Sequence, residues 1–171
     1  VKVPVICVGQ DNGVAISTPG GVGRAGGDIS KLVVGFPGLY IQNVDGTDVL
    51  ASYAVFKNAV EYCRARKGPA FIHAKVTRPY SHSLSDDEKL YRPAEELEAD
   101  AAIDAIKRFA EFLMTEGIAS SEQLEKMRSE VDAEVTAASD VAIENPQPAP
   151  ETALRNVVST AVDHTDRQPF Y

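Results

Sequence analysis

The stretch GLYIQNVDGTDVLASYAVFKNAVEYCRARKGPAFIHAKV, residues 38–76, contains a helix pattern between two strand patterns. Apolar residues in its middle step by four and three positions, the spacing of one helix face. They are Val49, Tyr53, Phe56, Val60 and Cys63. We expect Thr47 to cap this helix and Gly68-Pro69 to end it, with GLYIQNVDG and AFIHAKV as the flanking strands. A strand–helix–strand unit predicts a parallel sheet.

The residues before this unit add a third strand and a short helix. Val3 to Val8 is a continuous apolar run that ends at Gly9, the form of a strand covered on both faces. A loop rich in turn-forming residues follows, and Asp28 to Phe36 is expected to form a short helix. We therefore predict an α/β fold, a parallel sheet flanked by helices, in a domain of residues 1–92.

The second half of the chain has a helical pattern. Asp100 to Glu116 carries apolar residues on one face, and Ser120 with Gln123 forms a capping box before the next helix. The apolar stripe expected to pack that helix is Leu124, Met127, Val131, Val135 and Ala138. We predict a helical extension over residues 93–144, followed by a Pro-rich linker and tail over residues 145–171.

Composition narrows the class of protein. The chain has 171 residues, 44% of them hydrophobic, and a net charge of -8, which argues against a nucleic-acid partner. It has no apolar run of the ~20 residues needed to cross a membrane. Its two cysteines make no metal or disulfide pattern, so a reducing compartment is favoured. Because it opens on the apolar stretch VKVPVICVG without a Met, we expect a piece of a larger protein.

A glycine-rich motif offers one alternative function. Gly21 to Gly26 matches G-x-G-x-x-G, and Asp45 follows about 20 residues later, as in dinucleotide-binding domains of nicotinamide-dependent dehydrogenases. In such domains the first glycine turns directly off a buried strand, whereas here a polar loop with Pro19 intervenes. We favour a connecting segment and keep the dinucleotide-binding domain as an alternative.

Two polar stretches are candidates for chemistry. Asn12 follows the first strand, so it lies at the carboxyl end of the sheet, where open α/β sheets bind ligands. An amide oxygen and a nearby carbonyl suit Mg²⁺, although DNG also fits a tight turn. YSHSLSDDEKLYR, residues 80–92, places His82 among three serines. This second stretch fits a solvated surface loop or a catalytic loop, and a non-catalytic interaction domain is a further alternative.

Three segments in order carry a family resemblance: NGVAIST, then VDGTDVLASYAVFKNAVEYCRARKGPAFIHAKVTR, then SHSLSDDEKLYR. Together they resemble the alpha subunit of the decarboxylating first component of 2-oxoacid dehydrogenase complexes. The resemblance continues through DAIKRFAEFLMTEGIASSEQLEKMRSEVDAEV to VDHTD. It implies the C-terminal half of a thiamine-diphosphate-binding α/β domain and the cofactors thiamine diphosphate and Mg²⁺. It also implies oxidative decarboxylation of a 2-oxoacid, with transfer of the acyl group to a lipoyl domain.

The resemblance also implies roles for individual residues. Asn12 matches a Mg²⁺ ligand, and the Val14 backbone carbonyl matches a second. Gln10 occupies a position that contacts the diphosphate in some relatives. Arg78 matches a loop arginine near the cofactor, and His82 matches the active-site histidine, which we expect to act in catalysis and cofactor binding.

Further matches concern the loop around His82. Ser83 matches a serine that mitochondrial relatives phosphorylate. Asp86, Tyr91 and Arg92 match residues that order the loop near the docking face for the lipoyl domain. The pattern HSLSDD with a later Tyr-Arg pair looks nearer to branched-chain (2-oxoisovalerate) members than to pyruvate members. Asp11 departs from the family, which more often has Asn at this position.

The resemblance also implies what this piece lacks. The first Mg²⁺ carboxylate should precede Val1, and the glutamate that activates the cofactor belongs to a beta subunit or fused beta domain. We therefore expect the piece alone to be inactive. Its expected partners are that beta part, the lipoyl domain and a small 2-oxoacid. The expected location is the cytoplasm in a bacterium or the mitochondrial matrix in a eukaryote.

Overall fold

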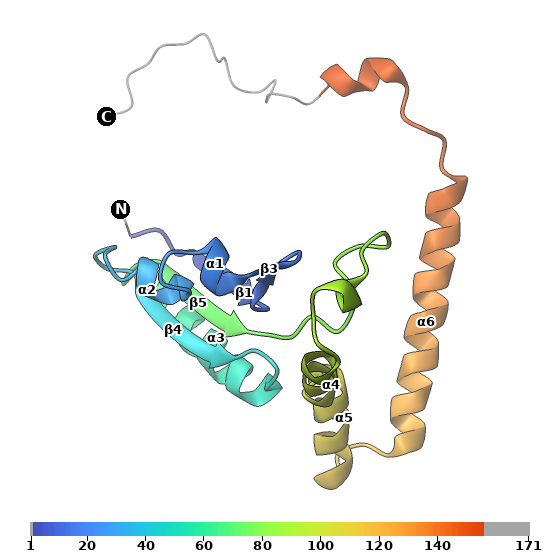
Figure 1. Ribbon diagram of the computed structural model, residues 1–171, viewed down its shortest axis with the longest axis horizontal. Helices are drawn as coiled ribbons and strands as arrows, with labels where there is room; N and C mark the ends of the chain where they lie inside the picture. The colour runs from blue at the N-terminus through green and yellow to red at the C-terminus, as the bar shows by residue number, and fades with distance from the viewer. Residues whose placement is uncertain (1, 156–171) are drawn as a thin grey trace. The chain divides into compact units, whose positions relative to one another are not determined.

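The computed structural model describes residues 2–155 (Figure 1). Three strands form a parallel sheet in the order β1-β5-β4, so the last of them in sequence lies in the middle. Their bounds are β1 Ile6–Asp11, β4 Tyr40–Asp45 and β5 Ala70–Lys75. Helix α3, Val49–Arg64, connects β4 to β5. The predicted α/β fold with a parallel sheet is confirmed.

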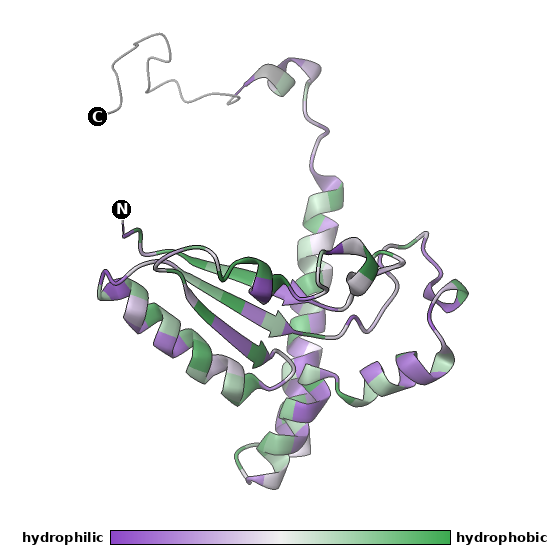
Figure 2. Cartoon of the chain, turned by 60° about the vertical axis from the view of Figure 1, so that its left-hand side comes forward, coloured by the Kyte–Doolittle hydropathy of each residue, from purple (hydrophilic) through white to green (hydrophobic). Residues whose placement is uncertain are grey.

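Helix α3 covers one face of the sheet. Its residues Ala59 and Cys63 are buried against Ala70 and Ile72 of the central strand. Figure 2 shows hydrophobic residues along the strands and hydrophobic residues alternating with polar ones along α3. This alternation is the helical period seen in the sequence, because only one face of α3 meets the sheet.

Small elements lie between β1 and β4. Strands β2, Val14–Ala15, and β3, Thr18–Pro19, pair antiparallel, and two single-turn helices follow. These helices are α1, Gly20–Gly23, and α2, Ile29–Leu32. Asp28 caps α2 by accepting a hydrogen bond from the Ser30 amide at 2.9 Å. The helix expected over residues 28–36 is thus shorter than predicted.

Two sequence-based predictions, on the cap of α3 and on the first strand, were wrong in detail. Asp48, not Thr47, caps α3, because the Asp48 carboxylate accepts from the Ala51 amide at 2.9 Å. The Thr47 hydroxyl instead donates to Asp45 at 2.7 Å. The first strand starts at Ile6 rather than Val3 and has a neighbour on one side only among the described residues. It is an edge strand with Val8 45% exposed, so it is not covered on both faces.

The predicted helix over residues 100–116 is interrupted. Helix α4 spans Ala94–Ala102 with Ile103 as its C-cap, and a separate helix, α5, spans Ala105–Thr115. The break lies at Asp104, whose carboxylate accepts from the Ile106 amide at 2.9 Å and caps α5. An aspartate side chain that bonds nearby backbone amides starts a helix better than it continues one. A short 3-10 helix, η1, Glu88–Leu90, precedes α4.

Backbone contacts divide the chain into residues 1–121 and residues 122–171. The second unit contains all but the first residue of α6, Ser121–Glu144, a single long helix as predicted. Its stripe residues Met127, Val131 and Val135 are exposed rather than packed as expected, since no described residue of this unit covers them. A 3-10 helix, η2, Pro150–Leu154, interrupts the stretch expected to be extended.

Some predictions stay open. Residues 156–171, with the VDHTD segment, lie outside the described residues. The predicted boundaries at residues 92 and 144 remain predictions. Among residues 2–155 no helix combines the length and apolar character that crossing a membrane requires.

Candidate functional site

The turn after β1 contains Asn12. Gly13 has a φ of 79°, a conformation that costs glycine little. Two side chains hold the turn: Asp11 accepts from the Gly13 amide at 3.0 Å, and Asn12 Oδ1 accepts from the Val14 amide at 3.1 Å. The tight turn considered for DNG is therefore present. Because an amide oxygen has two lone pairs, Asn12 Oδ1 keeps one for a ligand.

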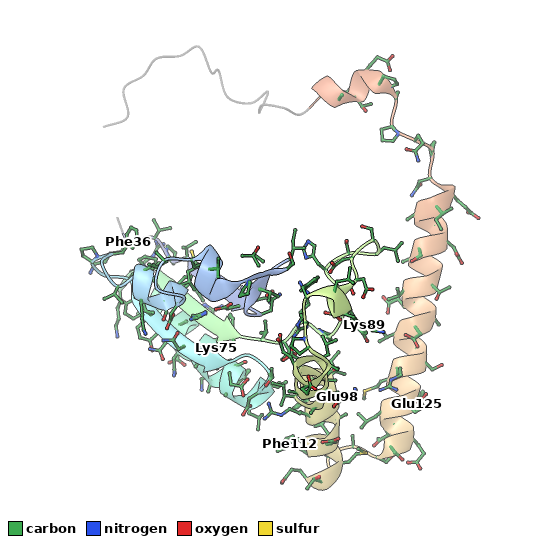
Figure 3. All side chains as sticks on the ribbon, in the orientation of Figure 1. Phe36, Lys75, Lys89, Glu98, Phe112 and Glu125 are labelled. Atoms are coloured by element: carbon green, nitrogen blue, oxygen red, sulfur yellow. The ribbon has the colours of Figure 1, made fainter. Side chains whose placement is uncertain are left out.

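The Val14 backbone carbonyl is the second candidate oxygen. Val14 stands opposite Pro19 in the β2–β3 register, next to the pair in which the Gly20 amide donates to the Gly13 carbonyl at 2.7 Å. Because bonded and non-bonded pairs alternate in an antiparallel ladder, the Val14 carbonyl points away from the partner strand. A cavity of about 370 Å³ opens beside this turn at the carboxyl end of β1 and β5. Its lining includes Asn12, Gly13 and Lys75, the last residue of β5, labelled in Figure 3. Two neutral oxygen donors beside this cavity fit part of a Mg²⁺ site.

The structure does not gather a complete metal site of the usual charged kind. Within residues 2–155, no group of three or more His, Cys, Asp or Glu side chains is placed to hold a metal ion.

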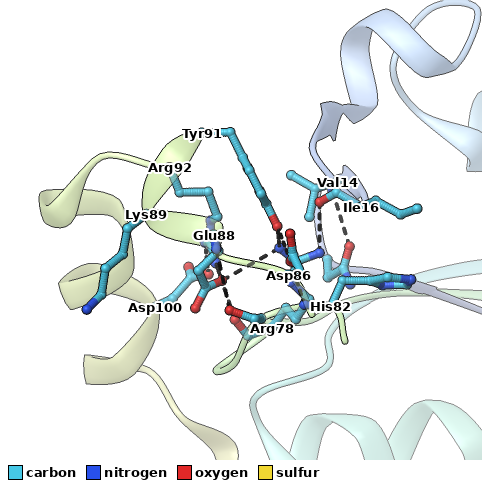
Figure 4. A network of polar contacts seen from close by, with 12 residues as sticks. Val14, Ile16, Arg78, His82, Asp86, Glu88, Lys89, Tyr91, Arg92 and Asp100 are labelled. Atoms are coloured by element: carbon cyan, nitrogen blue, oxygen red, sulfur yellow. Dashed lines mark hydrogen bonds and ion pairs between the residues drawn. The ribbon is translucent and has the colours of Figure 1, made fainter. Parts of the chain in front are cut away.

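The loop carrying His82 is tied to the β2–β3 hairpin (Figure 4). Arg78 donates one bond to the Ile16 carbonyl at 2.9 Å and another to the Tyr91 hydroxyl at 2.8 Å. Tyr91 in turn donates to Asp86 at 2.6 Å, and Asp86 accepts from the backbone amide of His82 at 2.9 Å. The contacts run unbroken from the segment after Asn12 to the backbone of His82.

This network constrains its members. Ile16 has a φ of 57°, a left-handed conformation that strains a β-branched residue, and its carbonyl receives the Arg78 bond. The Tyr91 hydroxyl and the His82 amide, both donating to Asp86, lower the pKa of that carboxyl. Burial and the same bond raise the pKa of Tyr91. Asp86 therefore stays ionised as an acceptor over the neutral range.

Arg92 joins this loop to helix α4. It is 5% exposed, and its guanidinium contacts three carboxylates and one carbonyl. The carboxylates are Glu88, Glu96 and Asp100, and the carbonyl is that of Arg78. Although burial opposes the charge, hydrogen bonds from Arg92 to Asp100, Glu96 and Glu88 raise the pKa of Arg92. A fully paired arginine of this kind fixes the loop's base.

The remaining predicted site residues, Gln10, His82 and Ser83, are exposed. Gln10 is exposed and pairs in register with Ala74, on the sheet face opposite Asp11 because side chains alternate along a strand. It does not line the cavity beside Asn12. His82 and Ser83 are exposed, and the Ser83 hydroxyl lies 3.3 Å from that of Ser85.

The glycine-rich motif lacks the geometry of a dinucleotide site. Gly21 lies in α1, a four-residue helix that follows the hairpin strand β3. The fingerprint requires a strand of the parallel sheet that leads directly into a longer helix, and β1 has already ended at Asp11. This contradicts the alternative of a nicotinamide dinucleotide-binding domain.

Comparison with known proteins decides the family. The family model described as dehydrogenase E1 component matches residues 1–151. The chain belongs to the dehydrogenase E1 component family. It is 39% identical to the alpha subunit of the pyruvate dehydrogenase E1 component of Acholeplasma laidlawii, over 78% of this chain and 39% of that protein. It is 36% identical to the 2-oxoisovalerate dehydrogenase alpha subunit of Bacillus subtilis, over 90% of this chain and 46% of that protein.

A third relative comes from an animal. The chain is 30% identical to a probable mitochondrial pyruvate dehydrogenase E1 component alpha subunit of Caenorhabditis elegans, over 98% of this chain and 44% of that protein. This E1 component chain thus spans less than half the length of these three relatives.

From the sequence, His73 is expected to be a satisfied core residue or an interface residue, and no polar partners are predicted for it. The structure bears out the satisfied core residue: His73 is 1% exposed and contacts Asp11, Asn43 and Asp28. The available signal was a histidine inside the apolar strand AFIHAKV, because a buried polar group requires partners. The identity of those partners was not readable from the strand itself.

Proposed function

We propose that the chain is part of the decarboxylating component of a 2-oxoacid dehydrogenase that uses thiamine diphosphate and Mg²⁺. The family match and the names of its relatives support this reaction class. A branched-chain 2-oxoacid is the favoured substrate, with pyruvate next, on the resemblance of the His82 loop. The product acyl group passes to a lipoyl domain.

One observation carries the proposal. Arg78 and Ile16 lie 62 residues apart in the sequence, and the Arg78 guanidinium donates a hydrogen bond to the Ile16 carbonyl at 2.9 Å. This bond links the loop of His82 to the hairpin that starts at Val14, two residues after Asn12. The resemblance assigns Asn12 and His82 to one active site, and this link supports that assignment.

The residues of this chain have separate roles in the proposal. Asn12 Oδ1 and the Val14 carbonyl would hold Mg²⁺, and thiamine diphosphate, when bound, supplies the electron sink for loss of CO₂. Arg78 has a buried Nε with no hydrogen-bond partner in the structure, a free donor that a diphosphate oxygen can satisfy. Gln10 is retained as a diphosphate contact on the resemblance.

His82 is the proposed proton donor. A histidine can both give and accept a proton near neutral pH. Acyl transfer to a lipoyl group opens its dithiolane ring, and the leaving sulfur needs a proton. Asp86 holds the backbone of His82 while leaving the imidazole exposed. The contacts that tie this loop to the hairpin and to α4 support the proposed loop-ordering roles of Asp86, Tyr91 and Arg92.

The proposed assembly supplies the missing groups. The first Mg²⁺ carboxylate belongs to a part of the protein before Val1, and the activating glutamate to a beta subunit or fused beta domain. The lipoyl domain and the 2-oxoacid are the remaining partners. The location is the bacterial cytoplasm or, as in the name of the nematode relative, the mitochondrion.

Replacing Asn12 with Ala in the complete enzyme is expected to weaken metal binding about 10-fold to 100-fold, because one oxygen ligand is lost. Mn²⁺ in place of Mg²⁺, titrated in the presence of thiamine diphosphate and followed by electron paramagnetic resonance, measures this directly. Asn58→Ala, on the exposed surface of α3, is the matched control. Equal Mn²⁺ affinity in the Asn12 variant and the wild type would remove Asn12 from the metal site.

Ser83→Glu tests the proposed regulation by phosphorylation. The Ser83 carbonyl accepts from the Asp86 amide at 3.1 Å, so a phosphate there would place about two negative charges beside Asp86. Repulsion should release Asp86 from its contacts with Tyr91 and His82. We expect at least about a tenfold loss of overall activity, while Ser83→Ala keeps it. Full activity in Ser83→Glu would rule out this mechanism.

A further inference from the structure

A polar cluster on the sheet face opposite α3 has no role in the proposed function, although most of its members line the cavity beside Asn12. Its members are His73 of the central strand β5, Asp11 of β1, Asn43 of β4, Asp28 before α2, and Arg24. His73 is among the largest fully buried side chains of residues 2–155. Because β5 lies between β1 and β4, the imidazole of His73 contacts residues of both outer strands.

The hydrogen bonds of His73 have a defined direction on one side. Its Nε2 lies 2.9 Å from Asp11 Oδ2, and an ionised carboxylate only accepts, so Nε2 donates. Its Nδ1 lies 3.1 Å from Asn43 Oδ1 and 3.4 Å from Asp28 Oδ1. Both ring nitrogens therefore have polar neighbours, and the His73 side chain is 1% exposed.

Asp11 passes this constraint to the turn. Its Oδ1 accepts from the Gly13 amide at 3.0 Å and from Arg24 at 2.9 Å, while Oδ2 is held by His73. Partial burial alone would raise the pKa of Asp11, but the bonds from Arg24, His73 and Gly13 outweigh it and lower the pKa to about 2. The carboxylate is thus ionised and held at both oxygens, on the residue immediately before Asn12.

We propose that His73 is a positioning residue, which through Asp11 sets the turn that presents Asn12 Oδ1 and the Val14 carbonyl to the metal. This inference rests on the proposed function for the role of the metal. Its physical basis is that a carboxylate free to rotate about its side-chain bonds would hold the Gly13 amide only part of the time. The buried imidazole, together with Arg24, restricts that freedom, so less ordering is required when the ion binds.

The test uses the complete enzyme with its beta part. His73→Ala should weaken Mn²⁺ binding in the presence of thiamine diphosphate by about tenfold. This is the lower end of the range of about 10-fold to 100-fold for loss of a group that orients a metal ligand. The rate at saturating metal and cofactor should stay within about twofold, because the role proposed for His73 is exerted through the metal ligands and not on the reacting groups. His73→Gln, which can still donate to Asp11, should recover most of the affinity.

A control and a second measurement separate positioning from general stability. Ile72→Ala removes a neighbouring buried side chain on the opposite sheet face, and should leave Mn²⁺ affinity unchanged although it destabilises the core. Hydrogen exchange at the Gly13 amide should accelerate in His73→Ala and not in Ile72→Ala. If His73→Ala leaves both the Mn²⁺ affinity and the Gly13 exchange at wild-type values, the inference is overturned.

The same experiment distinguishes this inference from the proposed function. If Asn12→Ala binds Mn²⁺ as the wild type does, the metal assignment fails. The positioning claim is then judged by Gly13 exchange alone: acceleration restricted to His73→Ala supports it, and equal exchange in the two variants overturns it.

Discussion

His82→Ala in the complete enzyme is expected to lower acyl transfer to the lipoyl domain by about 10²-fold to 10⁴-fold, the usual contribution of a general acid or base. Loss of CO₂, followed with an artificial electron acceptor, should fall far less, because that step does not require a proton on the lipoyl sulfur. The split between the two rates is the diagnostic result. It separates a proton donor from a residue that merely holds the active site together.

The structure makes this variant a clean test. His82 contributes its backbone amide to Asp86, and alanine keeps that bond, so the contacts among Asp86, Tyr91 and Arg78 should survive. Leu84→Ala, at a fully exposed position of the same loop, is the matched control and should transfer acyl groups normally. Undiminished transfer by His82→Ala would instead favour the non-catalytic interaction domain considered from the sequence.

Arg92→Met should destabilise the protein by about 3 kcal/mol. Removing one partner of a buried ion pair costs about 3–5 kcal/mol, because the remaining charges are left uncompensated. The lower end applies because the Glu96 side chain is 50% exposed and water screens it. Glu88 and Asp100, which are more buried, should account for most of the loss.

Urea unfolding of the complete enzyme, followed by circular dichroism, measures this effect as a lower midpoint. Arg128→Met is the matched control, since Arg128 forms an exposed pair with Glu125 at 3.8 Å and such pairs contribute at most about 1 kcal/mol. Hydrogen exchange across residues 78–92 should also accelerate in Arg92→Met. Unchanged stability and exchange would show that this guanidinium does not order the loop.

Local patterns in the sequence were enough for the α/β framework. The four-and-three spacing from Val49 to Cys63 predicted α3, because burying one helix face requires that period. The apolar runs on either side predicted β4 and β5, and a helix between two strands allows a parallel pair. The helix starts were less accurate: Asp48 and Asp104 each cap a helix at a position that the apolar pattern does not mark.

The family resemblance named the candidate residues, but it could not show how they contact one another. Asp86, Tyr91 and Arg78 form a connected series only once the loop is folded. The sequence indicated that His73 is a satisfied core residue but not which partners satisfy it, since these come from two other strands and a helix cap.

The sequence by itself thus determined the main elements of the sheet, β1, β4, α3 and β5, because those elements depend on the period of neighbouring side chains. Only the tertiary structure decided that β5 lies between β1 and β4, which brings His73 to Asp11 and Asn43. It also decided that Arg78 reaches Ile16 across 62 residues. Such contacts depend on strand order and loop paths, and no local spacing of residues encodes the distance between side chains so far apart in the chain.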